Sequence, residues 1–134
     1  MNSTIRKVMT MNKTEAQTTK KISGQFEKID RVFYKIMKGK RGKNNGIPDS
    51  ICTDKNGTIV GLELKSDKGY AYPNQVRQGI KIIQSGGRYI VGYYDFTIDA
   101  MDNEEFPKYV YTDEEMRPPK GKTYEIILEE RDDT

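Results

Sequence analysis

The sequence predicts an α/β fold, a mixed β-sheet core flanked by helices. Its hydrophobic periodicity indicates a helix, three strands, a second helix and further strands in that order, and elements in such an order pack as helices against a sheet. Its 134 residues, 34% hydrophobic and 32% charged, leave room for one domain with a modest core. We therefore expect a disordered tail over residues 1–12 and a single domain over residues 13–134.

The first helix and the first strand follow from local signals. Thr14 is a suitable N-cap and Glu15 favours the first helical turn. We expect this helix to end at Ser23-Gly24, because glycine commonly follows the last helical turn. Alternation over residues 31–37 predicts a strand, and residues 39–46, rich in glycine, asparagine and lysine, predict a loop.

A β-hairpin is predicted next. Two apolar runs, residues 47–53 and 58–65, lie on either side of Asn56-Gly57. Asn-Gly between such runs is the strongest short-range hairpin signal. The two runs should therefore pair as antiparallel strands.

A second helix and two more strands complete the expected core. Pro73 is favourable at the first position of a helix. The apolar residues of this helix recur with the spacing i, i+4, i+7, which places them on one face: Val76, Ile80 and Ile83. Residues 88–94 and 124–128 predict strands, and the acidic segment between them is expected to be a loop.

Composition restricts the possible chemistry. The chain has no histidine and a single cysteine, Cys52. These counts exclude Ser-His-Asp triads, Cys-His dyads, histidine-ligated zinc and Cys₄ metal sites. Any catalysis must use carboxylates, lysines, tyrosines or an oxygen-bound cation. We expect Cys52 to be a small core residue of its strand.

The cell compartment can be inferred from the same composition. No apolar run approaches the roughly 18–20 residues that a membrane span needs, and no apolar segment follows Arg6 and Lys7 as in a secretory signal. A single cysteine agrees with a reducing compartment. We expect a cytoplasmic protein that does not enter a membrane.

Charge is distributed unevenly along the chain. Residues 1–50 hold 12 Lys and Arg against 4 Asp and Glu, whereas residues 101–134 hold 5 against 11. The basic block indicates a phosphate-binding surface, with a solvated basic loop as the competing interpretation. Arg77 on the second helix is a further candidate for contact with phosphate, and a solvated helix face is its alternative. The block comprises Lys35, Lys38, Lys40, Arg41 and Lys43.

Three charged residues of the hairpin are the candidate catalytic group. Alternation places Glu63 and Lys65 on one face of their strand, and the hairpin brings Asp49 toward Glu63. Two carboxylates suit Mg²⁺, which prefers oxygen ligands and lowers the pKa of a bound water. Lys65 can hold the attacking hydroxide or balance charge on a phosphate. Each feature alone is common on protein surfaces, and their conjunction is the specific signal.

The motifs resemble the VRR-NUC branch of the PD-(D/E)xK nuclease superfamily, which includes small stand-alone phage and bacterial proteins. The resemblance covers residues 15–94. The resemblance implies a restriction-endonuclease-like fold. It also implies that Asp49, Glu63 and the main-chain carbonyl of Leu64 bind Mg²⁺ or Mn²⁺, and that Lys65 positions the water. Gln75 would complete the motif. The matching segments are Gly46-Ile47-Pro48-Asp49, Gly61-Leu62-Glu63-Leu64-Lys65-Ser66, Pro73-Asn74-Gln75 and Gly87.

The resemblance further implies a glutamate of the first helix near the metal, for which Glu15 is the best match and Glu27 the weaker one. If Glu15 only interacts with the helix dipole, its loss would cost little activity. As a whole, the resemblance implies a homodimeric, metal-dependent DNA endonuclease that cuts branched DNA such as Holliday junctions in a bacterial or phage-infected host cell.

Two other functions remain open. One is a catalytically silent nucleic-acid-binding or inhibitory protein on the same fold, because a fold does not fix a function. The other is a restriction-type or repair nuclease that acts on plain or nicked duplex DNA. Four tyrosines have two interpretations, stacking on unpaired bases or half-buried packing: Tyr70, Tyr72, Tyr93 and Tyr94. We favour packing for the last two.

Overall fold

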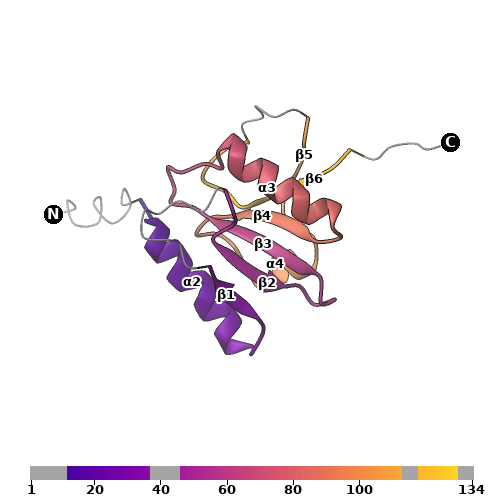
Figure 1. The fold of residues 1–134 in the computed structure, drawn as a ribbon. Helices are drawn as coiled ribbons and strands as arrows, with labels where there is room; N and C mark the ends of the chain where they lie inside the picture. The colour runs from indigo at the N-terminus through magenta and orange to yellow at the C-terminus, as the bar shows by residue number, and fades with distance from the viewer. Residues whose placement is uncertain (1–11, 37–45, 113–117, 130–134) are drawn as a thin grey trace.

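The computed structural model describes residues 12–36, 46–112 and 118–129, and Figure 1 shows them as a mixed sheet with helices packed on it. The elements in chain order are α2 (Glu15–Lys28), β1 (Phe33–Lys35), β2 (Ser50–Thr53), β3 (Ile59–Leu64), α3 (Pro73–Gln84), β4 (Arg88–Gly92), α4 (Ile98–Asp102), β5 (Lys108–Val110) and β6 (Tyr124–Ile127). The α/β class predicted from the sequence is confirmed. In the described ranges no helix combines the length and apolar character needed to cross a membrane.

The six strands form one sheet in the order β1-β2-β3-β4-β6-β5. The strands β1, β2 and β3 are antiparallel neighbours, so the predicted hairpin is confirmed. Strand β4 runs parallel to β3, and α3 connects them, because parallel neighbours need a long crossover. Strand β6 is antiparallel to β4 and parallel to β5. The central strand β3 is thus covered on both of its faces.

Helices α2 and α3 cover opposite faces of the sheet, as Figure 1 shows. The α2 face has Ile22 and Phe26 packed with the alternate β3 residues Leu62 and Leu64. The α3 face has Val76 and Ile80 packed with side chains of β4 and β6, namely Tyr89, Val91, Tyr124 and Ile126. Alternate residues of β3 therefore point to different helices, as their period of two requires.

Helix α2 begins where the sequence predicts and ends later. The Thr14 side chain and Gln17 form a reciprocal capping box at its start. The expected end at Ser23-Gly24 is wrong, because the helix continues to Lys28. Phe26 is fully buried one turn after Ile22, and burying this aromatic ring outweighs the modest cost of a glycine in a helix interior, about 1 kcal/mol.

The acidic segment between β4 and β6 is not only a loop, which corrects the expectation from composition. Thr97 caps the short helix α4 by accepting a hydrogen bond from the Ala100 N–H, and Met101 of this helix is buried. Strand β5 forms because β6 supplies its hydrogen-bonding partners in parallel register. Neither element has the length or periodicity that makes a pattern visible in the sequence.

A buried ion network joins the turn of the hairpin to the last strand. The Arg88 guanidinium donates to both carboxylate oxygens of Glu125, at 2.9 and 2.7 Å, and to Asp54 at 3.0 Å. Burial alone would raise the pKa of the Asp54 carboxyl, but hydrogen bonds from the Thr58 N–H, from Arg88 and from the Asn56 N–H outweigh it, and the net pKa lies below its usual value. Cys52 is buried nearby as predicted, and burial raises the pKa of its thiol to about 12.

Candidate active site

Asp49 and Glu63 lie side by side at one end of the β2–β3 hairpin. Ser50 pairs with Leu62, so continuing the antiparallel register places Asp49 next to Glu63. The Leu64 N–H donates to Asp49 Oδ2 at 3.1 Å, which fixes the carboxylate against the end of β3. Both carboxylates are buried, with exposed fractions of 5% and 1%. The sequence-predicted convergence of the two side chains is therefore present in the structure.

Gly46 positions the chain that leads into Asp49. Its φ of +83° is a left-handed conformation that glycine adopts without strain. A Cβ at this position would lie 2.6 Å from the main-chain oxygen of Asn74, at the start of α3. Any larger residue would push the segment containing Pro48 and Asp49 away from α3. The glycine thus sets the distance between the two carboxylates and the next residue of the cluster, Gln75.

Gln75 links Glu63 and Lys65 through the two ends of its side-chain amide. Its Nε2 donates to Glu63 Oε1 at 2.9 Å, and its Oε1 accepts from Lys65 Nζ at 3.0 Å. The same Oε1 accepts from the Tyr72 N–H at 2.8 Å. An ammonium only donates and a carboxylate only accepts, so the opposite orientation of the amide would lose both side-chain contacts. Gln75 therefore holds Glu63 and Lys65 in fixed positions relative to each other.

Lys65 follows directly after β3 and faces the same cluster. Its Nζ lies 3.6 Å from Glu63 Oε1, and its side chain is only 11% exposed. The main chain at this residue is held by a 3.0 Å hydrogen bond from its N–H to the carbonyl of Gly92. The ammonium also lies 5.6 Å from the ring centre of Tyr72. The cation is thus partly shielded from water, which strengthens its interaction with nearby negative charge.

The donor set of the cluster fits a hard divalent cation. Asp49 and Glu63 supply two carboxylates, and the Leu64 carbonyl is the third oxygen that the resemblance implies. Within the described residues there is no group of three or more His, Cys, Asp or Glu side chains able to hold a metal ion. Two carboxylates without a third are usual for Mg²⁺, which keeps several waters or phosphate oxygens as its remaining ligands, and too few for an all-protein Ca²⁺ cage.

The other predicted site residues lie outside this network. Glu15 is the exposed first residue of α2, and among the described residues its carboxylate has no hydrogen bond or ion pair. Arg77 is exposed on α3. Their roles stay predictions. Of the basic block, Lys35 is exposed at the end of β1. Its other members lie outside the described residues: Lys38, Lys40, Arg41 and Lys43.

The four tyrosines divide into two pairs. Tyr70 and Tyr72 lie next to the cluster with ring centres 4.7 Å apart, and Tyr72 is half exposed, so stacking on bases stays open for this pair. Tyr93 is fully buried and its hydroxyl donates to the carbonyl of Gly69 at 2.8 Å. Tyr94 is half-buried. Packing is thus confirmed for the second pair, with Tyr93 deeper than expected.

Tyr89 is a neighbour of the cluster that the sequence did not reveal. Its ring is fully buried against α3, where a Cβ on Gly79 would lie 2.4 Å from it. Burial raises the pKa of its hydroxyl well above the usual value, and the negative charges of Glu63 and Asp49 add to the shift. Glycine in the middle of an otherwise amphipathic helix is the one signal that hints at such a close approach.

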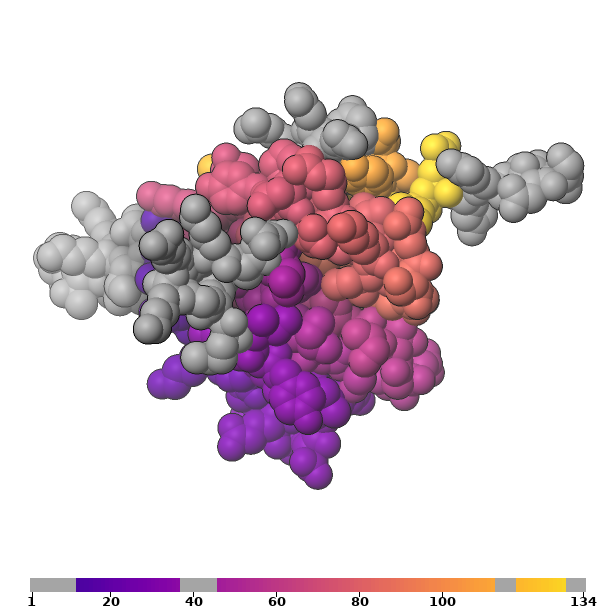
Figure 2. Space-filling view, viewed as in Figure 1, coloured from indigo at the N-terminus to yellow at the C-terminus, as the bar shows by residue number. Residues whose placement is uncertain are grey.

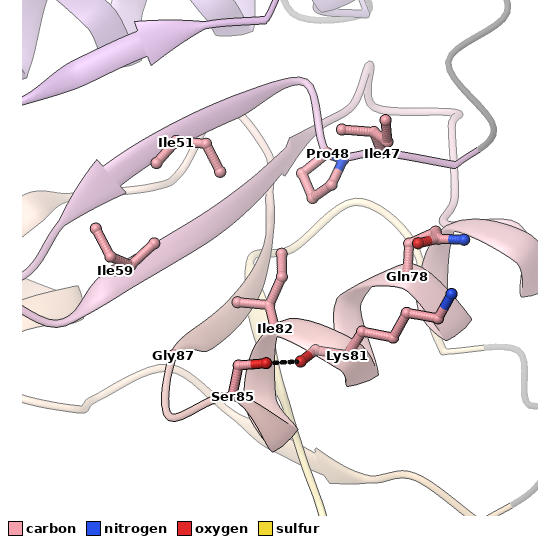
Figure 3. A pocket seen from close by; sticks show the side chains of 9 residues that line it. All are labelled: Ile47, Pro48, Ile51, Ile59, Gln78, Lys81, Ile82, Ser85 and Gly87. Carbon is pink, nitrogen blue, oxygen red and sulfur yellow. Dashed lines mark hydrogen bonds between the residues drawn. The ribbon is translucent and has the colours of Figure 1, made fainter.

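An apolar groove borders the cluster on the outer side of the hairpin. Its volume is about 480 Å³, and Pro48, the neighbour of Asp49, forms part of its wall. Figure 2 shows α3 and the β2–β3 hairpin meeting along this face, and Figure 3 shows side chains from both elements around the groove. Four of its nine lining residues are isoleucines, namely Ile47, Ile51, Ile59 and Ile82, and α3 adds Gln78 and Lys81.

Comparison with known proteins adds no assignment: no family model, curated protein or solved structure matches this chain. The proposed function therefore rests on the arrangement of four residues, namely Asp49, Glu63, Lys65 and Gln75.

Proposed function

We propose that this protein is a Mg²⁺-dependent DNA endonuclease of the PD-(D/E)xK type, similar to the VRR-NUC proteins that its motifs resemble. The observation that supports the proposal is one cluster at the end of the hairpin: Asp49, Glu63, Lys65 and Gln75. In it two buried carboxylates lie side by side, and one amide joins the second carboxylate to a shielded lysine.

The composition of this cluster favours a catalytic role over a purely structural one. Burying charged groups is costly. Asp49 and Glu63 are both buried side by side at one end of the sheet, and the Lys65 ammonium lies 3.6 Å from Glu63 Oε1. A second buried carboxylate beside the first favours uptake of a divalent cation, since a cation offsets their mutual repulsion. The arrangement therefore suits metal-assisted hydrolysis.

Each residue has a defined task in the proposed reaction. Asp49, Glu63 and the Leu64 carbonyl hold Mg²⁺, or Mn²⁺ in its place, which when bound polarises the scissile phosphate and lowers the pKa of a water. Lys65 orients the attacking water and offsets negative charge that develops on the phosphate. Gln75 is a positioning residue, because it acts by fixing Glu63 and Lys65.

The substrate is proposed to be branched DNA such as a four-way junction. A chain of 134 residues with one sheet has little surface for reading a long sequence, so recognition of DNA shape is the more economical mode. A homodimer is part of the proposal, because two copies of one active site can cut two strands symmetrically. The proposed setting is the cytoplasm of a bacterial or phage-infected cell.

The first experiment is cleavage of a labelled four-way DNA junction with Mg²⁺ or Mn²⁺. We expect product from the native protein, none in EDTA, and a loss of about 100-fold or more for Lys65→Ala. Lys55→Ala is the matched control, because Lys55 is an exposed lysine of the hairpin turn and its loss should leave cleavage unchanged. Linear, nicked and single-stranded DNA are compared in parallel.

The outcomes separate the competing functions. Junction cutting that survives EDTA or Lys65→Ala would contradict the proposed mechanism. Equal cutting of linear or nicked duplex would favour a restriction-type or repair nuclease. If the protein binds the junction but does not cut it with either metal, the function is instead that of the catalytically silent binding or inhibitory protein. A thermal melt of Lys65→Ala shows whether the variant is folded.

A further inference from the structure

A groove of basic character runs along the outer side of α2. Its volume is about 610 Å³, and among the described residues no carboxylate contributes to its lining. Three exposed lysines of α2 contribute to it, namely Lys20, Lys21 and Lys28, with Gln17, Gly24, Gln25 and Tyr94 completing the lining. One stripe of the helix holds residues with the spacing i, i+4, i+7 and i+11, namely Gln17, Lys21, Gly24 and Lys28.

The positive charge of this stripe is available to a ligand. Among the described residues, Lys20 and Lys28 form no ion pair. Lys21 Nζ donates to the carbonyl of Tyr94 at 2.8 Å and lies over the Tyr94 ring, so its charge meets no carboxylate there. At Lys28 the surface changes: the adjoining hollow, which Lys28 also lines, holds Arg31, Asp99 and Asp102, with Arg31 paired to Asp102 at 2.7 Å. The purely basic stripe ends at this point.

Gly24 lies in the middle of the stripe without a structural reason for being glycine. A Cβ at this position would meet no atom within 4 Å, so packing does not require its absence. Glycine weakens a helix interior relative to alanine. A glycine with open space beside it lets another backbone approach closely. The glycine and the flanking lysines thus point to the same kind of ligand, an extended polyanion lying against the helix.

The stripe starts at the end of the sheet where Lys65 emerges. Tyr94, which contacts Lys21, follows β4, and the last residue of that strand, Gly92, accepts the main-chain hydrogen bond of Lys65. Just before α2, the Lys13 N–H donates to Asp67, in the loop that follows Lys65, at 2.8 Å. A strand leaving the candidate active site at this end therefore meets the beginning of the stripe.

We propose that α2 binds the phosphate backbone of the DNA substrate, with Lys20, Lys21 and Lys28 contacting phosphates and Gly24 giving the strand room between them. From Lys20 to Lys28 the helix rises by about 12 Å, which corresponds to roughly three to four phosphates of one strand. The identity of the polyanion as DNA rests on the proposed function. An acidic membrane surface is the competing ligand, and the experiment includes it.

The test measures binding of a labelled junction and a labelled duplex by fluorescence anisotropy in EDTA, over a range of salt concentrations. Lys20→Gln/Lys28→Gln is compared with Lys55→Gln/Lys108→Gln, which removes the same charge from exposed lysines elsewhere. We expect the first pair to weaken binding at least about tenfold at 0.1 M salt and to reduce the slope of log K against log[salt] by about 1.8 for duplex. The control pair should change neither quantity appreciably.

A second variant tests whether DNA binding needs the open space beside Gly24, and it leaves the charge of the protein unchanged. Gly24→Leu fills the groove while the lysines remain, and Cβ has open space there, so the protein should fold normally. We expect weaker DNA binding. Unchanged binding by both Gly24→Leu and Lys20→Gln/Lys28→Gln would overturn the proposal, as would equal losses in the test and control pairs. Loss of binding to phosphatidylserine vesicles with intact DNA binding would assign the stripe to a membrane instead.

Failure of this proposal is distinguishable from failure of the proposed function. If the native protein cuts no DNA with either metal but Lys20→Gln/Lys28→Gln loses binding with the predicted salt slope, the stripe is a DNA-binding surface on a non-cutting protein. If the native protein cuts junctions and this variant binds and cuts them equally well, the nuclease stands and the assignment of α2 is wrong.

Discussion

At the scale of single residues, the candidate active site depends on the two ends of one amide. Gln75 bonds Glu63 through its Nε2, and both Lys65 and the Tyr72 N–H through its Oε1. The contact with Tyr72 also caps α3, so the residue that positions the ionic groups also stabilises the helix start. Local capping and site geometry are thereby coupled, and a change at Gln75 should affect stability and activity together.

The first prediction concerns cation binding at Glu63, measured by thermal melts with and without Mg²⁺. A ligand that binds only the folded state stabilises it, by roughly 1.4 kcal/mol at ten times its Kd, which corresponds to a rise in Tm of about 5 °C for a chain of this size. We expect this rise for the native protein and for Glu105→Gln, whose glutamate is exposed on the surface. Glu63→Gln should show little or none.

This measurement needs no substrate, so it separates metal binding from catalysis. A full Mg²⁺-dependent rise in the Tm of Glu63→Gln would exclude Glu63 as a ligand. No rise in the native protein at saturating Mg²⁺ or Mn²⁺ would remove the metal from the proposal.

At the scale of elements, the hairpin is fixed at both ends by different chemistry. One end carries the candidate active site, with Asp49 held by the Leu64 N–H. The other end carries the ion network of Arg88 with Asp54 and Glu125. The bidentate contact with Glu125 joins β4 to β6, and the contact with Asp54 joins both to the hairpin turn. This network makes the sheet one cooperative unit, since removing one buried partner leaves the others uncompensated.

The second prediction follows from the lowered pKa of Asp54. A carboxyl whose pKa is lower in the folded than in the unfolded state stabilises the fold above the unfolded pKa, near 3.8, and loses this contribution as pH falls below it. Asp54→Asn should therefore reduce the free energy of unfolding by about 2 kcal/mol at pH 7. Urea unfolding between pH 2.5 and pH 7 measures the difference from the native protein.

The difference should shrink as the pH falls below about 3.8. Asp99→Asn serves as the control, because Asp99 is exposed in the first turn of α4. A constant difference between Asp54→Asn and the native protein across this range would show that the charge of the Asp54 carboxylate does not stabilise the fold.

At the scale of the whole molecule, one sheet supports two grooves of opposite character. The groove between the hairpin and α3 is lined mainly by isoleucines, whereas the one along α2 is lined by lysines and glutamines. The two helices cover opposite faces of the sheet, and the candidate active site lies at the sheet end between them. The proposed path for DNA is therefore from this end along α2.

The third prediction is that the protein is a dimer, with a mass of about twice 15.4 kDa, or about 31 kDa, by light scattering after size exclusion. Two active sites are the simplest way to cut opposite strands of a junction symmetrically. A mass near 15.4 kDa at the concentration used for cleavage would remove the dimer from the proposal and would require that each strand be cut in a separate encounter.

Features that depend on neighbouring residues were readable from the sequence alone. The N-cap at Thr14, the Asn56-Gly57 turn and the proline start of α3 each follow from a few positions, whereas the reciprocal bond from Gln17 was not predicted. Strand alternation and the hairpin register together placed Asp49 beside Glu63, fourteen residues away in sequence. The class of fold and the core of the candidate site were therefore predictable, because periodicity and turn chemistry act over short distances.

Only the tertiary structure decided what depends on contacts between distant segments. The burial of Phe26 extended α2 past Gly24, and pairing with β6 made a strand of residues 108–110. The ring of Tyr89 under Gly79 and the approach of Tyr94 to Lys21 are equally non-local. Such hydrogen bonds and packing contacts join residues tens of positions apart, and no local pattern records them, because their stabilisation arises only when the chain has brought both partners together.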